Sequence, residues 1–326
     1  MRQIYNFNTK WAFSKEALEA PTTMPERWNW VNIPHTWNDI DGQDGGNDLY
    51  RGTAFYAKEL EKMDLPKADR YFLEIQGANS SAIVYVNGKK LANHDGGYST
   101  WRVDITDVLE DKNLFVFEVD NSPNDRVYPQ NADFTFYGGI YRDLNIIAVS
   151  ESHFDLEYYG TPGIKVTPEV VGENAKVEVE VFVKNVKENQ KLVYTLKDAE
   201  GNVVAEQETP ASQTVASFEI ENVHLWHGKK DPYLYTAEVC LKSEDEVLDN
   251  VSARFGCRTF EIHPENGFIL NGEEYPLRGV SRHQDRWGVG NALLKEHHDE
   301  DMDLICEVGA TTIRLAHYQH DQYFYD

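Results

Sequence analysis

The sequence predicts a mainly β protein in which two β domains precede one strand–helix–strand unit. Short apolar strands split by turns fill about residues 1–148, and a cleaner alternation of apolar and polar residues fills about 149–259. After about residue 260, a helical pattern stands between two strand patterns. With 326 residues, 41% of them hydrophobic, the chain can bury more than one core. We therefore predict three domains, at 1–148, 149–259 and 260–326.

Charge, hydropathy and cysteine content exclude several classes of protein. The 31 basic and 55 acidic side chains give a net charge of −24, which rules out an electrostatic nucleic-acid binder. We expect a cytoplasmic protein without a membrane partner, because neither a signal peptide nor a run of about 18 apolar residues is present. Cys240, Cys257 and Cys306 lie far apart without a Cys-x-x-Cys pair, so we expect buried thiols rather than disulfides or a zinc site.

The first domain has the pattern of an all-β fold. Tyr71–Ile75, Ala82–Val86 and Leu114–Val119 are predicted strands. Asn87-Gly88 tolerates positive φ at both positions and predicts a type I′ hairpin after the second of these strands. The polar, glycine-rich segment Asp39–Asp48 is predicted to be an exposed loop.

The second domain shows strict alternation, most clearly in Lys176–Lys184, where four valines share one face. Further strand patterns follow at the spacing of a sandwich: Leu192–Leu196, Val203-Val204, Ala216–Ile220 and Tyr233–Val239. About 110 residues of this kind suit one immunoglobulin-like domain. Only the architecture is implied, since the paired cysteines and central tryptophan of antibody domains are missing.

After residue 260 the pattern predicts a βαβ unit, which requires a parallel sheet. Tyr275–Val280 is a predicted buried strand, Glu296–Val308 a helix that Gly309 ends in the left-handed conformation, and Thr311–Ala316 a second strand. The apolar face of the helix is formed by residues at i, i+3 and i+4: Met302, Ile305 and Cys306. Because a (β/α)8 barrel needs about 250 residues, we expect only its beginning here.

Two histidines directly follow these two strands, and barrel enzymes bind substrates at the carboxyl ends of their strands. His283 follows the first strand and His317 the second. Arg314, three residues before His317, is placed to hold a carboxylate in its ionised form. Each of these side chains is also compatible with a structural role, as a satisfied core histidine or a core ion pair.

The aromatic-rich loop Pro129–Asp143 combines Asp133 with several aromatic rings, a mixture suited to sugars. The alternative is a buried aromatic corner in which Asp133 caps a turn. Metal binding at His297-His298 with Asp301, or at His317 with His320, is disfavoured because a third placed ligand is missing.

Four ordered motifs resemble glycoside hydrolase family 2, and within it the bacterial β-galactosidases. They are Leu277-Arg-Gly-Val-Ser-Arg-His-Gln-Asp285, Thr312-Ile-Arg-Leu-Ala-His-Tyr318, Tyr137-Gly-Gly-Ile-Tyr-Arg-Asp143, and Leu225-Trp226 with Pro232-Tyr-Leu-Tyr235. The resemblance implies a jelly-roll sugar-binding domain, an immunoglobulin-like sandwich and the start of a catalytic (β/α)8 barrel. It departs from the family pattern at three positions, which are Gln284, Ala316 and Gln319.

Carried over by motif, His283 and His317 would contact the galactosyl ring, Arg314 would orient the nucleophilic carboxylate, and Asp133 would reach the sugar hydroxyls. The family's acid/base glutamate follows an asparagine, and the sequence contains no Asn-Glu dipeptide. We therefore expect no catalytic residue in this chain and no activity of the chain alone. The resemblance allows Mg²⁺ and Na⁺ in the complete enzyme, but no metal or other cofactor in this chain.

The main prediction is the amino-terminal part of a retaining β-galactosidase whose partner is a β-galactoside sugar. A β-glucuronidase of the same family is the nearest alternative, and a non-catalytic carbohydrate-binding β-sandwich protein or a structural interaction module are the others. A homo-oligomer is compatible with the sequence, because an incomplete barrel leaves strand edges uncovered.

Overall fold

The computed structural model describes residues 1–43, 48–127, 132 and 134–326. It divides into two compact units. Unit 1 comprises Met1–Arg2, Val149–Val280 and Gly309–Ile313, and unit 2 comprises Gln3–Ala148, Ser281–Val308 and Arg314–Asp326. The first β domain and most of the βαβ unit therefore belong to the same unit, although they lie far apart in sequence.

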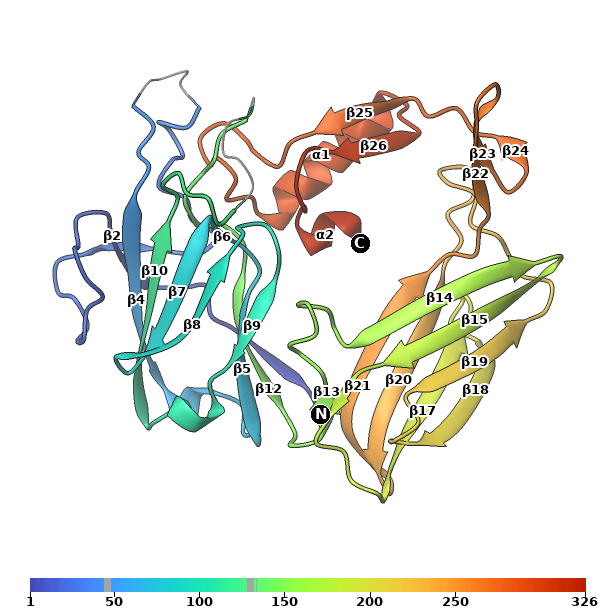
Figure 1. Cartoon of the computed structure of the whole chain (residues 1–326), viewed down its shortest axis with the longest axis horizontal. Helices are drawn as coiled ribbons and strands as arrows, with labels where there is room; N and C mark the ends of the chain where they lie inside the picture. The colour runs from blue at the N-terminus through green and yellow to red at the C-terminus, as the bar shows by residue number, and fades with distance from the viewer. Residues whose placement is uncertain (44–47, 128–131, 133) are drawn as a thin grey trace. The chain divides into compact units, whose positions relative to one another are not determined.

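Unit 2 is built around a sandwich of two antiparallel sheets (Figure 1). The six-stranded sheet has the order β3(Asn29–Val31), β2(Trp11–Ser14), β4(Thr53–Glu61), β10(Lys112–Asp120), β7(Ser81–Val86), β8(Lys89–Asp95). The four-stranded sheet has the order β1(Gln3–Asn6), β12(Leu144–Val149), β5(Arg70–Ile75), β9(Trp101–Asp104). A small sheet pairs β6(Ala78–Asn79) with β11(Gly139–Ile140), and two 3₁₀ turns cover Lys62–Asp64 and Thr106–Val108.

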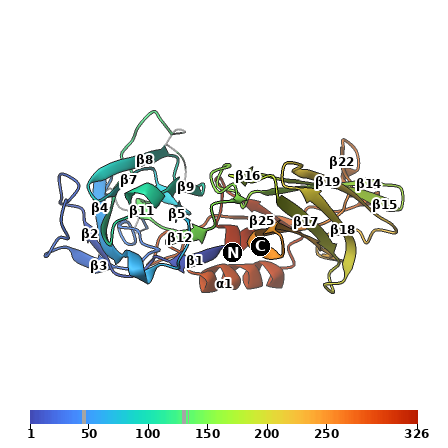
Figure 2. The ribbon, with the colours of Figure 1, turned by 90° about the horizontal axis from the view of Figure 1, so that it is seen from below.

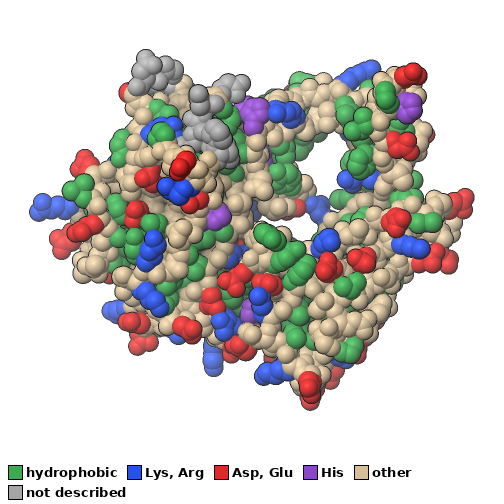
Figure 3. All heavy atoms as spheres, in the orientation of Figure 1, with side chains coloured by type: hydrophobic (Ala, Val, Ile, Leu, Met, Phe, Trp, Pro, Cys, Tyr) green, Lys and Arg blue, Asp and Glu red, His purple; other side chains and the backbone are tan. Residues whose placement is uncertain are grey.

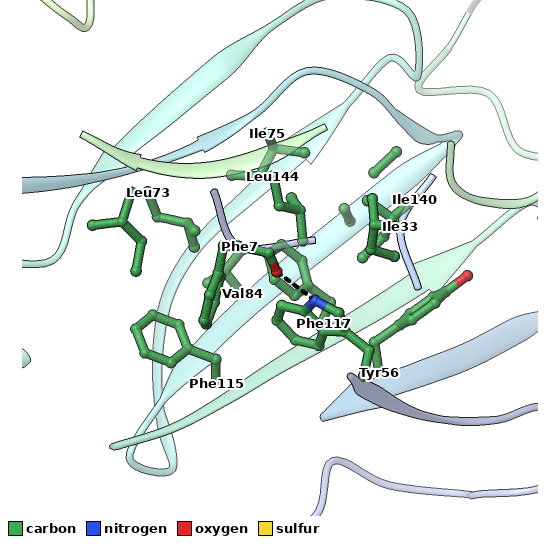
Figure 4. Packing of buried hydrophobic residues seen from close by; sticks show 14 of the residues in the cluster. Phe7, Ile33, Tyr56, Leu73, Ile75, Val84, Phe115, Phe117, Ile140 and Leu144 are labelled. Carbon is green, nitrogen blue, oxygen red and sulfur yellow. Dashed lines mark hydrogen bonds between the residues drawn. The ribbon is translucent and has the colours of Figure 1, made fainter. Parts of the chain in front are cut away.

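The core of this sandwich lies between its two sheets. Leu73 and Ile75 from β5 face Phe115 and Phe117 from β10, and all four are fully buried (Figure 4). Figure 2 shows β4, β7 and β8 on one side and β1, β5 and β12 on the other. Burying each such side chain contributes about 1.5–3 kcal/mol, so the alternating pattern that predicts the strands also supplies the driving force that pairs the sheets.

The predicted hairpin at Asn87-Gly88 is confirmed. Val86 pairs with Lys89 across the turn, and φ is 52° at Asn87 and 76° at Gly88, as a type I′ turn requires. The Asn87 side chain fixes the turn further, because its Nδ2 donates to Val108 O at 3.0 Å and its Oδ1 accepts from Leu114 N at 2.9 Å.

Unit 1 contains the second sandwich. One sheet has the order β14(Ile164–Val171), β15(Asn174–Val181), β19(Val215–Ile220), and the other β18(Val203–Pro210), β17(Gln190–Lys197), β20(Tyr235–Ser243), β21(Glu246–Phe255). Val177, Val179 and Val181 are buried on one face as predicted. The predicted strand is too long, however: it ends at Val181, and Val183 belongs to β16(Val183–Lys184), which pairs with β13(His153–Phe154). A three-stranded sheet follows, made of β22(Phe260–His263), β23(Gly267–Leu270) and β24(Glu273–Glu274).

The βαβ unit consists of β25(Gly279–Arg282), α1(Lys295–Glu307) and β26(Thr312–Leu315). Thr311 N donates to Arg278 O and Ala316 N to Arg282 O, so the two strands run parallel as predicted. Gly309 has a φ of 76° and ends the helix in the left-handed conformation, also as predicted. A short helix that the sequence analysis missed, α2(Gln322–Tyr325), begins at Asp321, whose side chain accepts from Tyr323 N.

Two expectations for this unit are wrong. The strand predicted at Tyr275–Val280 begins only at Gly279, because Pro276 has no N–H to donate to a ladder, and it is not buried but largely exposed. The helix does not bury an apolar face either: Met302 and Ile305 are half-buried, and Cys306 is exposed. The buried residue of α1 is instead His298, since this face of the helix packs on Arg282, to which His298 and Asp301 are hydrogen-bonded.

Other sequence features are distributed as follows. All three cysteines are thiols, of which Cys257 is buried as expected, Cys240 half-buried, and Cys306 exposed, contrary to expectation. Acidic and basic side chains are interspersed over the visible surface rather than gathered by sign (Figure 3). Within the described part of the chain, no helix is long and apolar enough to cross a membrane.

Candidate functional site

The two histidines predicted from the strand ends lie close together in unit 2. The ring centroids of His283 and His317 are 5.3 Å apart and the rings are nearly perpendicular. Phe134, from the aromatic-rich loop of the sandwich, lies against both: its centroid is 5.7 Å from that of His283 and 5.6 Å from that of His317. His317 is exposed, and His283 and Phe134 are half-buried, so the three rings form an accessible aromatic and polar surface.

Arg314 fixes the chemical form of His317. Its Nη2 donates to His317 Nδ1 at 2.9 Å, and its Nη1 donates to Ser281 Oγ at 3.3 Å. A guanidinium can only donate, so Nδ1 of His317 must accept and the ring proton of the neutral imidazole stands on Nε2. Nε2 is therefore the donor nitrogen of the His317 ring.

Tyrosine rings extend the aromatic surface beside the histidines. Tyr318 stacks on Tyr98 with centroids 4.2 Å apart, and its ring lies 5.3 Å from that of Phe134. The Tyr318 hydroxyl accepts from Gln284 N at 3.3 Å. Tyr98 comes from the sandwich and Tyr318 from the segment after β26, so the two parts of unit 2 both contribute to this surface.

The loop that carries Phe134 is held by buried side chains of the sandwich. Asn121 donates from Nδ2 to Phe136 O at 3.1 Å, Asn38 accepts from Gly138 N at 2.8 Å, and Asn79 donates to Tyr137 O at 2.7 Å. Asn38, Asn79 and Asn121 are at most 1% exposed, and unmade hydrogen bonds at such depth are costly. The alternative reading of the loop is thus partly realised: residues 136–141 form a buried aromatic corner, while Phe134 reaches the histidines.

Arg282, next to His283, is the centre of a buried polar network. Its Nε and Nη2 donate to Asp301 at 2.8 and 2.6 Å, its Nη1 donates to His320 Nδ1 at 3.0 Å, and Nη2 also reaches His298 Nδ1 at 3.1 Å. The Phe324 ring lies 3.9 Å from the guanidinium carbon. Asp301 neutralises the buried cation, and both histidines serve it as neutral acceptors.

His320 links this polar network to Ala316, the residue before His317. Its Nε2 donates to Ala316 O at 3.3 Å, so both ring nitrogens are satisfied in the neutral form. Burial, with a smaller contribution from the charge of Arg282, lowers the pKa of His320 from 6.5 to about 4. Burial likewise lowers the pKa of His298.

Tyr137 connects the aromatic loop to the segment after β25. Its hydroxyl donates to Asp285 Oδ2 at 3.0 Å, and its backbone carbonyl is held by Asn79. Burial, together with the carboxylate of Asp285, raises the pKa of Tyr137. The phenol therefore stays protonated and remains a donor across the pH range in which proteins fold.

The predicted site residues have different outcomes. His283, His317 and Arg314 lie together, whereas Asp133 is outside the described residues. Sequence reasoning missed the individual importance of Phe134 and Arg282, although each lies in a motif or loop that it quoted. Their positions in those segments were the available signal, but their partners lie too far away in sequence to be inferred.

The described residues do not form the metal site that the resemblance allows in the complete enzyme. Among residues 1–43, 48–127, 132 and 134–326, no group of three His, Cys, Asp or Glu side chains could hold a metal ion. His298 and His320 instead turn their Nδ1 atoms to Arg282, and His317 turns its Nδ1 to Arg314.

Three family models match the chain in succession. They are the glycosyl hydrolase 2 galactose-binding domain-like model over residues 48–137, the glycosyl hydrolases family 2 model over 162–258, and the glycosyl hydrolases family 2 TIM barrel domain over 260–326. The chain belongs to glycosyl hydrolase family 2. The mainly β class, with the beginning of a barrel, is thereby confirmed, and the site lies where the galactose-binding-like domain meets the barrel segment within unit 2.

The curated relatives of this family 2 chain include proteins named β-glucuronidase and proteins named β-galactosidase. A β-glucuronidase of Bacteroides fragilis is 37% identical over all of this chain and 48% of its own length. A β-galactosidase of Thermoanaerobacter pseudethanolicus is 27% identical over all of this chain and 45% of its own length. The chain thus spans about half the length of these curated relatives.

Solved structures agree with the fold. An FMN-binding β-glucuronidase from Faecalibacterium prausnitzii L2-6 superposes with a TM-score of 0.93 and 41% identity, covering all of this chain and 50% of that one. A Bacteroides uniformis β-glucuronidase has a TM-score of 0.91 and 32% identity, covering 99% of this chain and 40% of that one.

Proposed function

We propose that this chain supplies part of the sugar-binding site of a retaining β-glycosidase, and that the sugar is a β-glucuronide. The observation that carries the site is the meeting of His283, His317 and Phe134 at the ends of two parallel strands. The glucuronide replaces the β-galactoside of the sequence-based prediction. Its support is that the 37% identical relative is named a β-glucuronidase, whereas the named β-galactosidase is 27% identical.

The proposed roles follow from the chemistry of the side chains. Phe134 offers an apolar ring face to the C–H side of a pyranose, and the Nε2–H of His317 offers a donor to a ring hydroxyl. Arg314 brings a positive charge beside His317, where it would favour an ionised carboxylate. None of these groups is a carboxylic acid, so they bind and orient rather than cleave.

Cleavage with retention needs two carboxyl groups about 5–5.5 Å apart, one as acid/base and one as nucleophile. No such pair is assigned to this chain, and it stays a prediction that the chain alone hydrolyses nothing. Purified chain incubated with chromogenic β-glucuronide and β-galactoside substrates should release no product above a buffer control. Authentic turnover by the chain, free of host enzyme, would contradict this assignment.

Binding is tested by titrating the whole 326-residue chain with methyl β-D-glucuronide and methyl β-D-galactoside. Isothermal titration calorimetry gives the affinity, and NMR of ¹⁵N-histidine-labelled protein reports on the imidazoles of His283 and His317. We expect the glucuronide to shift both resonances and to bind more tightly than the galactoside. Tighter galactoside binding would restore the original prediction, and shifts that bypass both histidines would reject the site.

Phe134→Ala and Trp30→Ala form a matched pair of variants for this test. Trp30 is a 64% exposed aromatic on β3 of the same sandwich, so it controls for unspecific stacking of sugars on surface rings. We expect Phe134→Ala to weaken glucuronide binding by roughly tenfold, which corresponds to the loss of about one aromatic contact, and Trp30→Ala to leave it unchanged. Equal losses in both variants would indicate unspecific stacking.

A non-catalytic sugar-binding sandwich stays the alternative from another class. It predicts that binding depends on the sandwich but not on the barrel segment. His317→Ala separates the two cases, because His317 is exposed and follows β26 in the barrel segment. Unchanged affinity in this variant would favour the independent sugar-binding sandwich.

A further inference from the structure

One buried arginine of the sandwich contacts both segments that carry the site histidines. Arg142 lies between β11 and β12 and is 4% exposed. Its Nη1 donates to Tyr98 O at 2.8 Å and to Gln76 O at 3.4 Å. Its Nη2 donates to Gln319 O at 2.6 Å and to Gln284 Oε1 at 3.4 Å. The two terminal nitrogens of the guanidinium thus bind different segments: Nη1 binds the sandwich, and Nη2 binds the barrel segment.

The two acceptors in the barrel segment are neighbours of the site residues. Gln284 follows His283 directly, and Gln319 stands two residues after His317. Gln284 is 1% exposed, and its Oε1 also accepts from Asp321 N at 2.7 Å. One amide oxygen and one guanidinium nitrogen therefore join both segments at a single point.

The surroundings of position 284 favour a neutral amide over a carboxylate. Asp321 already supplies a carboxylate oxygen 3.9 Å from Arg142 Nε, and a second carboxylate at 284 would place two anions around one cation. A neutral amide accepts both hydrogen bonds without adding charge. The residue at position 142 must donate to several acceptors from one planar group, which the guanidinium of arginine can do and the ammonium of lysine cannot.

We propose that Arg142 is a positioning residue that sets the separation of the His283 and His317 rings through Gln284 and the Gln319 carbonyl. The inference rests on the proposed function, since the rings are argued to bind the sugar. Arg142 itself is buried beneath the site and acts on the sugar only through the two segments it holds. The distance between sugar-binding groups is thereby fixed by a residue of the sandwich, not of the barrel.

The test uses the whole chain with Arg142→Lys, Gln284→Leu and the double variant. Arg102→Lys is the matched control: Arg102 is also a buried arginine of the sandwich, with its side chain 8% exposed, and it pairs with Glu74 of the same sandwich. Two readouts are compared, namely the ring ¹⁵N shifts of His283 and His317 without sugar, and the dissociation constant for methyl β-D-glucuronide.

We expect Arg142→Lys and Gln284→Leu each to move both imidazole signals and to weaken glucuronide binding by roughly tenfold or more. The double variant should lose little beyond either single variant, because both changes break the same junction. Gln284→Glu keeps an acceptor at the junction but adds a second carboxylate beside Asp321, so it should weaken binding, though less than Gln284→Leu. Arg102→Lys should leave the histidine signals and the affinity unchanged.

Unmoved histidine signals in Arg142→Lys would overturn the proposal, and so would equal shifts in Arg102→Lys, which would indicate general loosening of the sandwich. If Arg142→Lys fails to fold, Gln284→Leu alone decides by the same two signals. A third outcome is that the histidine signals move as expected but neither the wild type nor any variant binds the sugar. That result would support the positioning role of Arg142 and would reject the proposed function.

Discussion

Replacing His320 by glutamine should flatten the dependence of folding stability on pH between pH 6.5 and 4. In the native chain the imidazole accepts from Arg282 at Nδ1 and donates from Nε2 to Ala316 O. Protonation would put an N–H where the guanidinium donates, and a second cation beside it. Burial, with Arg282 adding to it, therefore lowers the pKa of His320 from 6.5 to about 4.

The sign and size of the effect follow from proton linkage. Between pH 6.5 and 4 the unfolded chain binds more protons at residue 320 than the folded chain, so stability rises with pH in this window. The contribution is complete above pH 6.5 and is lost as the pH falls toward 4. With about 1.4 kcal/mol for each unit of pKa, the loss by pH 5 is about 2 kcal/mol.

Urea unfolding followed by tryptophan fluorescence measures this, because six of the seven tryptophans lie in unit 2 with His320. Glutamine can still donate to Ala316 O but does not titrate. We expect the stability difference between wild type and His320→Gln to shrink by about 2 kcal/mol from pH 7.5 to 5. Carboxylates whose pKa is lowered, such as Glu74, stay ionised there and are common to both proteins. Parallel curves for the two proteins would refute the reasoning.

Three further changes test the fold. Gly139→Ala should destabilise unit 2 by about 2 kcal/mol or more, since φ is 135° and the new Cβ would lie 2.4 Å from His35 O; unchanged urea unfolding would contradict this. Glu74→Gln should cost about 3–5 kcal/mol because it leaves buried Arg102 without its carboxylate, and a midpoint equal to wild type would be unexpected. Leu192 is fully buried in the second sandwich. Leu192→Ala should therefore lower the stability of unit 1 by about 2–5 kcal/mol, as reported by Trp226 fluorescence, and an unchanged stability would contradict this.

The parts of the fold set by local chemistry were predictable. Asn87-Gly88 specifies its own turn, and the alternation around Val179 specifies a buried face because the side-chain period of a strand is two. The errors occur where one residue breaks a regular pattern. Pro276 delays β25, and the strand pattern through Phe182 continues although the strand itself ends at Val181.

The candidate site was predictable only in part, for a different reason. The ends of parallel strands lie at one edge of a sheet, so the proximity of His283 and His317 followed from βαβ topology alone. The partners of Arg142 are 142 and 177 positions away, at Gln284 and Gln319. No local pattern encodes such pairings, and the polar face of α1 is equally invisible until Arg282 is known to lie beneath it.

The hairpin turn also bears on how the protein ages. An Asn-Gly pair is prone to spontaneous deamidation: the backbone nitrogen of the glycine attacks the side-chain carbonyl of the asparagine, ammonia leaves, and water opens the resulting succinimide to an aspartate or isoaspartate. In the folded chain that side chain is held at both ends, by Leu114 N on its oxygen and by Val108 O on its nitrogen. The native turn therefore resists the attack, whereas an unfolded chain does not. Slow appearance of an extra negative charge at position 87 during storage would record how often this hairpin opens.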